Sequence, residues 1–393
     1  MNPTVLTPAD CARIAPALAG TRHPNVWVYR FTHPDPARHW ILSIATHAEP
    51  GSQKLSLGGF RIAPRERTEQ PGFDPDSEAI GLAIGMEEKI YWSRLLGIGG
   101  PLARRDMSRI VGGKCVLQPT DDARVGKPND FALLDWAIEC FRAFEQQAGV
   151  RLTTGQDLGH GLMSDGKTQS LDYLSSHFLG SVDADTSRPT AEGNYYVLKG
   201  MLSAAGVPLD RATVGLIGVG NIGQHVFDRI HADGSKVFAV ELRDERRKHL
   251  NAAGATAWSP DRKMDLLRQP LDALVVNAAG GSLDEETVSA CAANDRLSVV
   301  CGSENLVMTD ARGEDRLRAA HKSYCPTELG GMMGYLTAVE EYLALVEGVP
   351  FKMDGILEAA KLLEPAVEKA TAVQRKGNFA GTFEDAVHQV FAR

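Results

Sequence analysis

One stretch of the chain has the sequence Ala212-Thr-Val-Gly-Leu-Ile-Gly-Val-Gly-Asn-Ile-Gly223. Its aliphatic first half is typical of a buried strand. The apolar residues Ile222, Val226 and Ile230 then recur every four positions, as on one face of a helix. We therefore predict a strand, a glycine-rich turn and a helix, around which the rest of the chain is organised.

The glycines of this stretch have the spacing of a phosphate-binding turn. Gly218, Gly220 and Gly223 form the pattern GxGxxG. The first glycine permits the tight turn, the second lets the backbone approach a pyrophosphate, and the third allows the helix to pack closely on the strand. The phosphates would lie at the helix N-terminus, beside Asn221 and Ile222, where free N–H groups point at them.

A second predicted strand, Lys236-Val-Phe-Ala-Val-Glu241, ends in an acidic residue. Glu241 follows Gly220 by 21 residues, which is the offset expected of a carboxylate that binds the adenosine ribose. This spacing favours NAD over NADP. The alternative is that the arginines within residues 243–247 bind a 2′-phosphate, but such arginines are also typical of the solvated face of a helix.

The composition is that of an ordinary globular protein long enough for two domains. The chain has 393 residues, of which 43% are hydrophobic and 23% charged. It has no apolar stretch long enough to span a membrane and no secretory signal at its N-terminus, so we expect a cytoplasmic protein. The net charge of −8 argues against a nucleic-acid partner. The six cysteines lack metal-ligand spacing and are expected to be reduced packing residues, with no metal site.

Predicted secondary structure indicates an α/β protein with two different sheets. Short strand-like runs before about residue 72 suggest a mixed sheet. Helices are predicted from Asp76, with Ser77 as a cap, and over 130–147, with Gly149 at the end. From residue 212 on, six short strands alternate with helices, which predicts a doubly wound Rossmann sheet of order 3-2-1-4-5-6.

These elements suggest a division of the chain into two domains. We expect a substrate and oligomerisation domain at residues 1–187 and an NAD-binding Rossmann domain at 188–340. The C-terminal part, 341–393, has the apolar spacing of helices and is expected to complete the first domain.

Further motifs occur in a fixed order along the chain. They are Leu57-Gly-Gly-Phe-Arg61, Gly85-Met-Glu-Glu-Lys89, Gly112-Gly-Lys-Cys-Val116, Thr153-Thr-Gly-Gln-Asp-Leu-Gly159 and Thr190-Ala-Glu-Gly193. Together with the glycine-rich turn, they resemble the glutamate/leucine/phenylalanine/valine dehydrogenase family, and the shorter leucine and phenylalanine branch most closely.

The resemblance implies NAD-dependent oxidative deamination of an L-amino acid to a 2-oxo acid, or its reverse. Gly58 and Gly59 would form the substrate loop, and Lys89 would hold the α-carboxylate as a point charge. A second lysine nearby is driven toward its neutral form by like-charge repulsion and burial, so that Lys114 can activate water. Asp157 would move protons to and from the nitrogen.

The cofactor implied by the resemblance is NAD, with Thr190 close to its nicotinamide. The expected partners are a small-molecule amino acid or 2-oxo acid and further copies of the chain, with no nucleic acid and no membrane. The residues expected to bind the cofactor are Gly218, Gly220, Asn221, Ile222, Gly223, Glu241, Thr190, Asn277 and Asn305.

Departures from the family pattern suggest a changed substrate side chain. The two lysines lie 25 residues apart, which indicates an insertion at about 95–110 beside the active site. His160 stands where the family has a small hydroxyl residue, and the segment 328–334 lacks the family's asparagine. We expect leucine and phenylalanine to be poor substrates and a polar side chain to be bound by charged residues, namely Arg104, Arg105, Arg109, Glu304 and Glu328.

Two other functions stay open at this point. The chain could be an NAD-dependent oxidoreductase that acts on another amine or imine. It could also be a catalytically silent, NAD-sensing regulatory protein, although the retention of Lys89, Lys114 and Asp157 argues against this.

Overall fold

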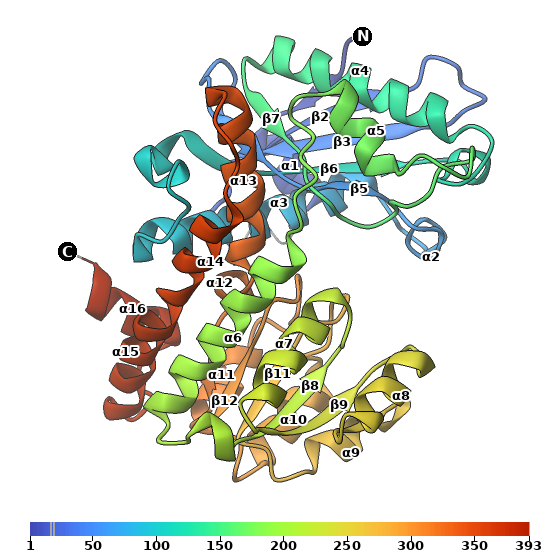
Figure 1. Ribbon diagram of the computed structural model, residues 1–393. Coiled ribbons are helices and arrows are strands. Elements are labelled where there is room, and N and C mark those ends of the chain that lie inside the picture. Colours follow the sequence, from blue (N-terminus) through green and yellow to red (C-terminus); the bar gives the residue numbers. More distant parts are fainter. Residues whose placement is uncertain (16–17, 19, 393) are drawn as a thin grey trace. The chain divides into compact units, whose positions relative to one another are not determined.

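The computed structural model describes residues 1–15, 18 and 20–392, and its contacts divide the chain into two compact units (Figure 1). Each unit combines helices with its own sheet, so the predicted α/β class with a mixed and a parallel sheet is confirmed. The first unit consists of Met1–Tyr91, Pro101–Ala184 and Tyr335–Lys352, and the second of Trp92–Gly100, Asp185–Gly334 and Met353–Arg393.

The first unit is built on a seven-stranded mixed sheet of order β1-β2-β3-β6-β4-β7, with β5 also paired to β6. The pairs from β1 through β3 to β6 are antiparallel, whereas β4 and β5 run parallel to β6, and β7 runs parallel to β4. The strands are β1 (Thr4–Leu6), β2 (Trp27–Thr32), β3 (Ile41–Thr46), β4 (Leu55–Leu57), β5 (Phe60–Ile62), β6 (Ile110–Gln118) and β7 (Arg151–Thr153).

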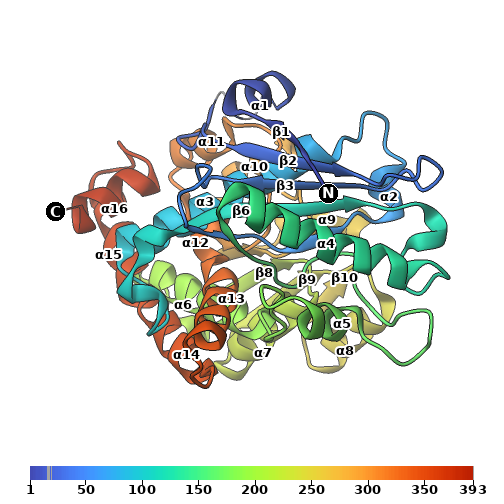
Figure 2. The same cartoon turned by 90° about the horizontal axis from the view of Figure 1, so that it is seen from above.

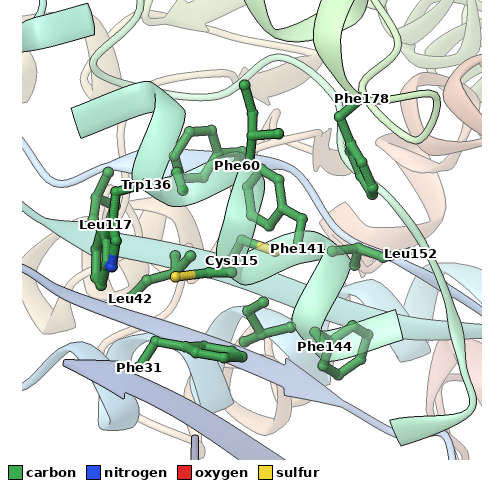
Figure 3. Close-up of a cluster of buried hydrophobic side chains, with 14 of the residues drawn as sticks. Phe31, Leu42, Phe60, Cys115, Leu117, Trp136, Phe141, Phe144, Leu152 and Phe178 are labelled. Atoms are coloured by element: carbon green, nitrogen blue, oxygen red, sulfur yellow. The ribbon is translucent and has the colours of Figure 1, made fainter. Parts of the chain in front are cut away.

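Helices cover both faces of this sheet. Alternate strand residues point to opposite faces, so Cys115 packs with Phe141 of α4 (Asp130–Ala148), while Val116 packs with Ala83 of α3 (Pro75–Leu96). Figures 1 and 2 show α4 along the strands, and Figure 3 shows the aromatic core beneath it, where Phe60 and Phe141 meet edge to face. Full burial of each such side chain is worth about 1.5–3 kcal/mol. The other helices of this unit are α1 (Pro8–Ile14), α2 (Arg65–Thr68) and α5 (Ser170–His177).

The ends of the two long helices test the capping predictions. α4 ends at Gly149, whose φ of +59° is the left-handed conformation of a glycine cap, as expected. At the start of α3, however, the Asp74 carboxylate accepts the N–H of Ser77 at 3.0 Å. Asp74 therefore caps this helix, and the prediction that Ser77 does so is wrong.

The second unit contains a six-stranded parallel sheet of order β10-β9-β8-β11-β12-β13. Numbered from its first strand, this is the order 3-2-1-4-5-6, so the predicted doubly wound sheet is confirmed. The strands are β8 (Thr213–Ile217), β9 (Lys236–Val240), β10 (Thr256–Trp258), β11 (Ala273–Val276), β12 (Val299–Gly302) and β13 (Ser323–Tyr324). The helices are α6 (Ser187–Ala204), α7 (Asn221–Ala232), α8 (Asp244–Ala252), α9 (Lys263–Leu267), α10 (Glu285–Ala293), α11 (Gly313–Ala319) and α12 (Thr327–Gly330).

The C-terminal helices are shared between the units, which differs from the prediction that 341–393 completes the first domain. Most of α13 (Met332–Glu347) belongs to the first unit, but α14 (Met353–Lys361), α15 (Leu363–Lys376) and α16 (Phe383–Phe391) belong to the second. α15 packs on α6, where a Cβ on Gly200 would lie 2.3 Å from the carbonyl oxygen of Glu364. The apolar face of α15 thus packs on α6 at Gly200. The sequence of α15 alone does not indicate that α6 is its partner.

Two composition-based expectations concern the whole chain. All six cysteines are free and buried, in agreement with their predicted role as packing residues. In the part of the chain that the structure describes, no helix has the length and apolar character needed to cross a membrane.

Candidate active site

Lys114 and Asp157 form a buried ion pair in the first unit. Lys114 lies on β6, and Asp157 follows the carboxyl end of β7. Lys114 Nζ contacts Asp157 Oδ2, and the two side chains are only 7% and 13% exposed. Because charges removed from water must be compensated by close partners, this pair needs the neighbours described below.

The glycine pair after β4 brings the backbone against this ion pair. A Cβ on Gly59 would lie 2.9 Å from Lys114 Nζ and 3.3 Å from Asp157 Cβ. A Cβ on Gly58 would lie 2.1 Å from the carbonyl oxygen of Gly113. A side chain at either position would therefore displace the lysine or the β6 backbone.

Arg61, which the sequence analysis did not assign to the site, binds the same aspartate. Its Nε lies 3.2 Å from Asp157 Oδ2, and its Nη2 lies 3.3 Å from Oδ1. Burial raises the pKa of Asp157, but the charges of Lys114 and Arg61 outweigh burial and hold the pKa well below its usual range. Asp157 is thus ionised at neutral pH. The available signal for Arg61 was its place directly after Gly-Gly-Phe in the substrate-loop motif.

Lys89 lies on α3 and is buried. Glu87, two residues before it, accepts the backbone N–H of Gly112. A Cβ on Gly112 would lie 2.4 Å from the backbone nitrogen of Glu87, so α3 packs directly on the Gly-Gly-Lys segment of β6. The motifs that carry Lys89 and Lys114 are therefore in contact through Glu87.

His160, in the loop after β7, links the first residues of β5 and α5. Its Nε2 lies 2.7 Å from the carbonyl oxygen of Phe60, and its Nδ1 lies 3.1 Å from Ser170 Oγ. Because a carbonyl oxygen only accepts, Nε2 carries the proton and Nδ1 accepts from the serine. Burial lowers the pKa of His160, which keeps the ring neutral in this arrangement.

In the second unit, the glycine-rich turn has the conformation that GxGxxG predicts. Gly218 has a φ of +83°, and a Cβ on Gly223 would lie 2.3 Å from the carbonyl oxygen of Gly218. Around Gly220 there is open space: among the described residues beyond its neighbours, the nearest atom to its Cβ position is Arg246 Nη1 at 3.8 Å. Asn221 and Ile222 are the first residues of α7. The turn therefore leaves room for a pyrophosphate at the helix N-terminus.

Glu241, at the end of β9, is buried beside this turn. Its Oε2 accepts the N–H of Val219 at 2.7 Å, and its Oε1 accepts the N–H of Arg243 at 2.8 Å. Each oxygen keeps a further lone pair with which it can accept a ribose hydroxyl. These acceptors therefore suit the ribose hydroxyls of NAD.

Two of the nearby arginines bind the chain itself. Arg246 donates to the carbonyl oxygen of Val219 at 2.6 Å and to Asn221 Oδ1 at 3.0 Å. Arg247 donates to the carbonyl oxygens of Glu241 and Leu242 at 2.8 and 2.6 Å. Both side chains thus hold the loops around Glu241.

An unsatisfied donor lies next to the carboxyl end of β11. Asn277 Oδ1 accepts from Ser303 Oγ at 2.8 Å and from Asn194 Nδ2 at 3.3 Å. Within the described residues, the buried Nδ2 of Asn277 has no hydrogen-bond partner. Since buried polar groups are normally hydrogen bonded, this donor fits a group of a bound dinucleotide. Of the other expected cofactor residues, Thr190 is buried and donates to the carbonyl oxygen of Thr186, and Asn305 is exposed after β12.

Glu304 holds the loop after β11. Its Oε2 accepts the N–H of Ala278 at 2.9 Å, and its Oε1 accepts the N–H of Ser282 at 2.8 Å. These contacts give the buried carboxylate a structural role, and its binding of a substrate group stays a prediction.

The part of the expected insertion that lies in the first unit, residues 101–110, leads into β6. It forms 3-10 turns at Ala103–Arg105 and Met107–Arg109, and Glu340 of α13 accepts the N–H groups of Leu102 and Ala103 at 2.8 and 3.0 Å. Arg105 and Arg109 line a cavity of about 360 Å³ together with Leu55, Ile110 and Arg151, the first residues of β4, β6 and β7. Lys114 lies further along β6 and Asp157 beyond the end of β7, so residues 101–110 are not beside this pair, contrary to the expectation.

Comparison with known proteins relates the second unit to NAD-binding domains and most of the chain to amino acid dehydrogenases. Residues 184–289 match the family model "D-isomer specific 2-hydroxyacid dehydrogenase, NAD binding domain". The chain is 30% identical over 296 residues to valine dehydrogenase of Streptomyces virginiae, a match that covers 73% of each chain. It is 22% identical over 333 residues to leucine dehydrogenase of Geobacillus stearothermophilus, covering 82% of this chain and 79% of that one.

Solved structures have the same fold. L-tryptophan dehydrogenase from Nostoc punctiforme matches with a TM-score of 0.62 at 17% identity, over 93% of this chain and 94% of that one. A hetero-hexameric glutamate dehydrogenase from Thermus thermophilus matches with a TM-score of 0.64 at 15% identity, over 97% and 94%.

The Rossmann sheet and the glycine-rich turn, with the buried Glu241 beside it, together with the match to an NAD-binding family model, define an NAD-dependent dehydrogenase. The identity to valine dehydrogenase over most of both chains narrows this class, and the chain belongs to the glutamate/leucine/phenylalanine/valine dehydrogenase family. The prediction of an NAD-dependent oxidoreductase acting on the CH–NH₂ group of amino acids is confirmed.

Proposed function

We propose that the Lys114–Asp157 pair carries out the oxidative deamination of an L-amino acid, with Lys89 on the α-carboxylate and Gly58 and Gly59 against the substrate. The first unit would thus bind the amino acid and the second NAD. The observation that carries this proposal is the burial of a lysine–aspartate ion pair directly beside a glycine backbone. In such a site a proton can be held and moved without exchange with bulk water.

The residues fit the steps of the reaction. NAD held at the glycine-rich turn would supply the hydride acceptor for the α-carbon, and water then attacks the imine carbon of the oxidised substrate. Lys114 Nζ orients this water, and the proton that the water loses passes to the Asp157 carboxylate beside it. Asp157 then protonates the nitrogen, which leaves as ammonia, so one amino acid, one NAD⁺ and one water give a 2-oxo acid, ammonia, NADH and a proton.

The substrate side chain is proposed to differ from those of leucine and phenylalanine. The support for this is the segment 328–334, which departs from the family pattern near the nucleotide-binding residues. There, Cβ atoms on Gly330 and Gly334 would lie 2.0 Å from the carbonyl oxygen of Gly302 and 2.4 Å from Thr190 Oγ1. Arg105 and Arg109 do not support a charged substrate side chain, because they line the cavity at the first residues of β4, β6 and β7.

A screen tests the proposal. Each proteinogenic L-amino acid and several diamino acids are incubated with NAD, and NADH absorbance and released ammonia are both measured. We expect one substrate with a kcat/KM at least about tenfold above those of leucine and phenylalanine, and ammonia equal to NADH. NADH without ammonia would favour the alternative amine or imine oxidoreductase, and no NADH with any amino acid would refute deamination.

The cellular location and the oligomeric state of the protein are also proposals. We propose a cytoplasmic homo-oligomer. The hetero-hexameric assembly named for the Thermus thermophilus glutamate dehydrogenase supports the oligomeric state alone. Light scattering of the purified chain measures its mass directly, and a monomer at micromolar concentration would contradict the proposal.

A further inference from the structure

Asp157 belongs to a chain of alternating charges that continues beyond the proposed catalytic pair. Arg61 on β5 binds Asp157 with two nitrogens, and its Nη1 lies 2.7 Å from Glu78 Oε1 on α3. Glu78 Oε2 in turn lies 3.3 Å from Nη2 of Arg67. The Arg61 and Glu78 side chains are only 10% and 6% exposed, whereas Arg67 is 41% exposed. Asp157, Arg61 and Glu78 thus form a buried network of charged side chains, and Arg67 lies at its exposed end.

The two cations on Asp157 differ in what they can do. Lys114 makes one contact with Oδ2 and must release it to act on water or substrate. Arg61 faces both carboxylate oxygens, which fixes the carboxylate in position and rotation. A guanidinium also stays protonated at any working pH, so it cannot exchange protons with the substrate.

We propose that Arg61 is a positioning residue that keeps Asp157 in place and ionised when Lys114 turns to the substrate, and that Glu78 anchors Arg61 to α3. This role rests on the proposed function of Lys114 and Asp157. Without Arg61, an aspartate buried to this degree would take up a proton as soon as Lys114 left it. The charged and titratable groups that face Asp157 are Lys114 of β6, Arg61 of β5 and the neutral His160 of its own loop, and Glu78 faces it through Arg61.

The test measures the ionisation of Asp157 with Lys114 removed, and it needs no turnover. The carboxyl ¹³C resonance of Asp157, assigned with Asp157→Asn, is followed from pH 8 downward in Lys114→Gln and in Lys114→Gln/Arg61→Gln. With Arg61 present, the carboxyl should stay ionised below the value of about 3.9 for a free aspartate. Without both cations, burial should raise its titration above that value by about one unit or more. Equal titration in both variants would overturn the proposal.

A matched variant controls for damage to the fold. Arg30 on β2 also binds a buried carboxylate of α3, since its Nη1 lies 3.1 Å from Asp76 Oδ2, but it has no contact with Asp157. Lys114→Gln/Arg30→Gln should titrate like Lys114→Gln alone. If it shifts as far as the Arg61 double variant, the effect belongs to the fold and the proposal fails. Lys114→Gln/Arg61→Lys keeps the charge with less bulk and should restore part of the low titration.

Kinetics with Lys114 in place give the second readout. Arg61→Gln should lower kcat about tenfold to hundredfold and move the acid limb of the kcat profile to higher pH, with KM changed less than about threefold. Arg61→Lys should recover part of kcat. An unshifted acid limb would overturn the proposal. If the wild-type chain deaminates no amino acid, the proposed function fails, but the ¹³C titration still decides whether Arg61 controls Asp157.

Discussion

Glu241 Oε2 accepts the backbone N–H of Val219 at 2.7 Å, which fixes the carboxylate at the rim of the glycine-rich turn. A 2′-phosphate at the ribose would meet this buried negative charge. We therefore expect kcat/KM with NAD to exceed that with NADP by at least about tenfold. Steady-state kinetics with both cofactors check this, and Arg243→Gln, which leaves Glu241 intact, should preserve the preference. A higher kcat/KM with NADP would mean that the carboxylate does not define the ribose site.

Alanine substitutions at Gly220 and at Gly223 of the glycine-rich turn should have different effects. Gly220→Ala adds a methyl group where the chain itself leaves space, so the unfolding temperature should change by less than about 2 °C. If a pyrophosphate lies there, the Kd for NADH should rise about tenfold or more. Gly223→Ala should instead destabilise the protein, because its Cβ would lie 2.3 Å from the carbonyl oxygen of Gly218. Unchanged NADH affinity in Gly220→Ala would argue against the cofactor site.

The close packing at Gly59 predicts a loss of catalysis. In Gly59→Ala the new methyl group would lie 2.9 Å from Lys114 Nζ and 3.3 Å from Asp157 Cβ, so the ion pair must move. We expect kcat to fall about a hundredfold. Gly81→Ala on α3 is the control, since no described atom outside its own helix backbone and chain neighbours lies within 4 Å of its Cβ position. That variant should keep full activity and gain up to about 1 kcal/mol of stability. Equal activity of the two variants would refute the packing argument.

Glu314 predicts a pH-dependent stability. Burial, together with the charges of Asp315 and Glu384, raises the pKa of this carboxyl to about 7. Because its pKa in the unfolded chain is about 4.3, the folded state binds the proton more tightly. The resulting stability is fully present below about pH 4.3 and is lost as the pH rises through 7. Glu314→Gln should therefore unfold at higher denaturant concentration than wild type at pH 8, with a smaller difference at pH 5. A larger gain at pH 5 would contradict the shift.

The parts of the fold that could be predicted from sequence are those where local pattern and global position agree. β8 to β13 alternate with helices along the chain, and parallel strands with such connections have few allowed orders. The conformations of Gly218 and Gly223 followed from the turn itself. That Lys114 and Asp157 belong to one site was expected only through the family resemblance, since Lys114 lies on β6 and Asp157 follows β7; their direct contact was not predicted.

The failures concern contacts made by residues distant in the chain. Glu304 follows a strand, as a ligand-binding acid would, and its contacts with the N–H groups of Ala278 and Ser282, from the preceding connection, were not predicted. Arg61 was missed because its partner lies 96 residues further on. The two meet because the N–H groups of Phe60 and Ile62 on β5 donate to the carbonyl oxygens of Gly155 and Leu158 in the loop after β7. An apolar helix face, as in α15, indicates that the helix packs but not on which surface.

The most direct test of deamination by the Lys114–Asp157 pair is the turnover of Lys114→Ala with the best substrate from the screen, measured together with the affinity of this variant for NADH. Lys114 is proposed to act on water, whose proton passes to Asp157. It lies on β6 of the first unit, whereas the glycine-rich turn belongs to the second unit. If Lys114 has this role, kcat should fall by about three orders of magnitude while the Kd for NADH stays within about twofold. Turnover within about threefold of wild type would contradict it.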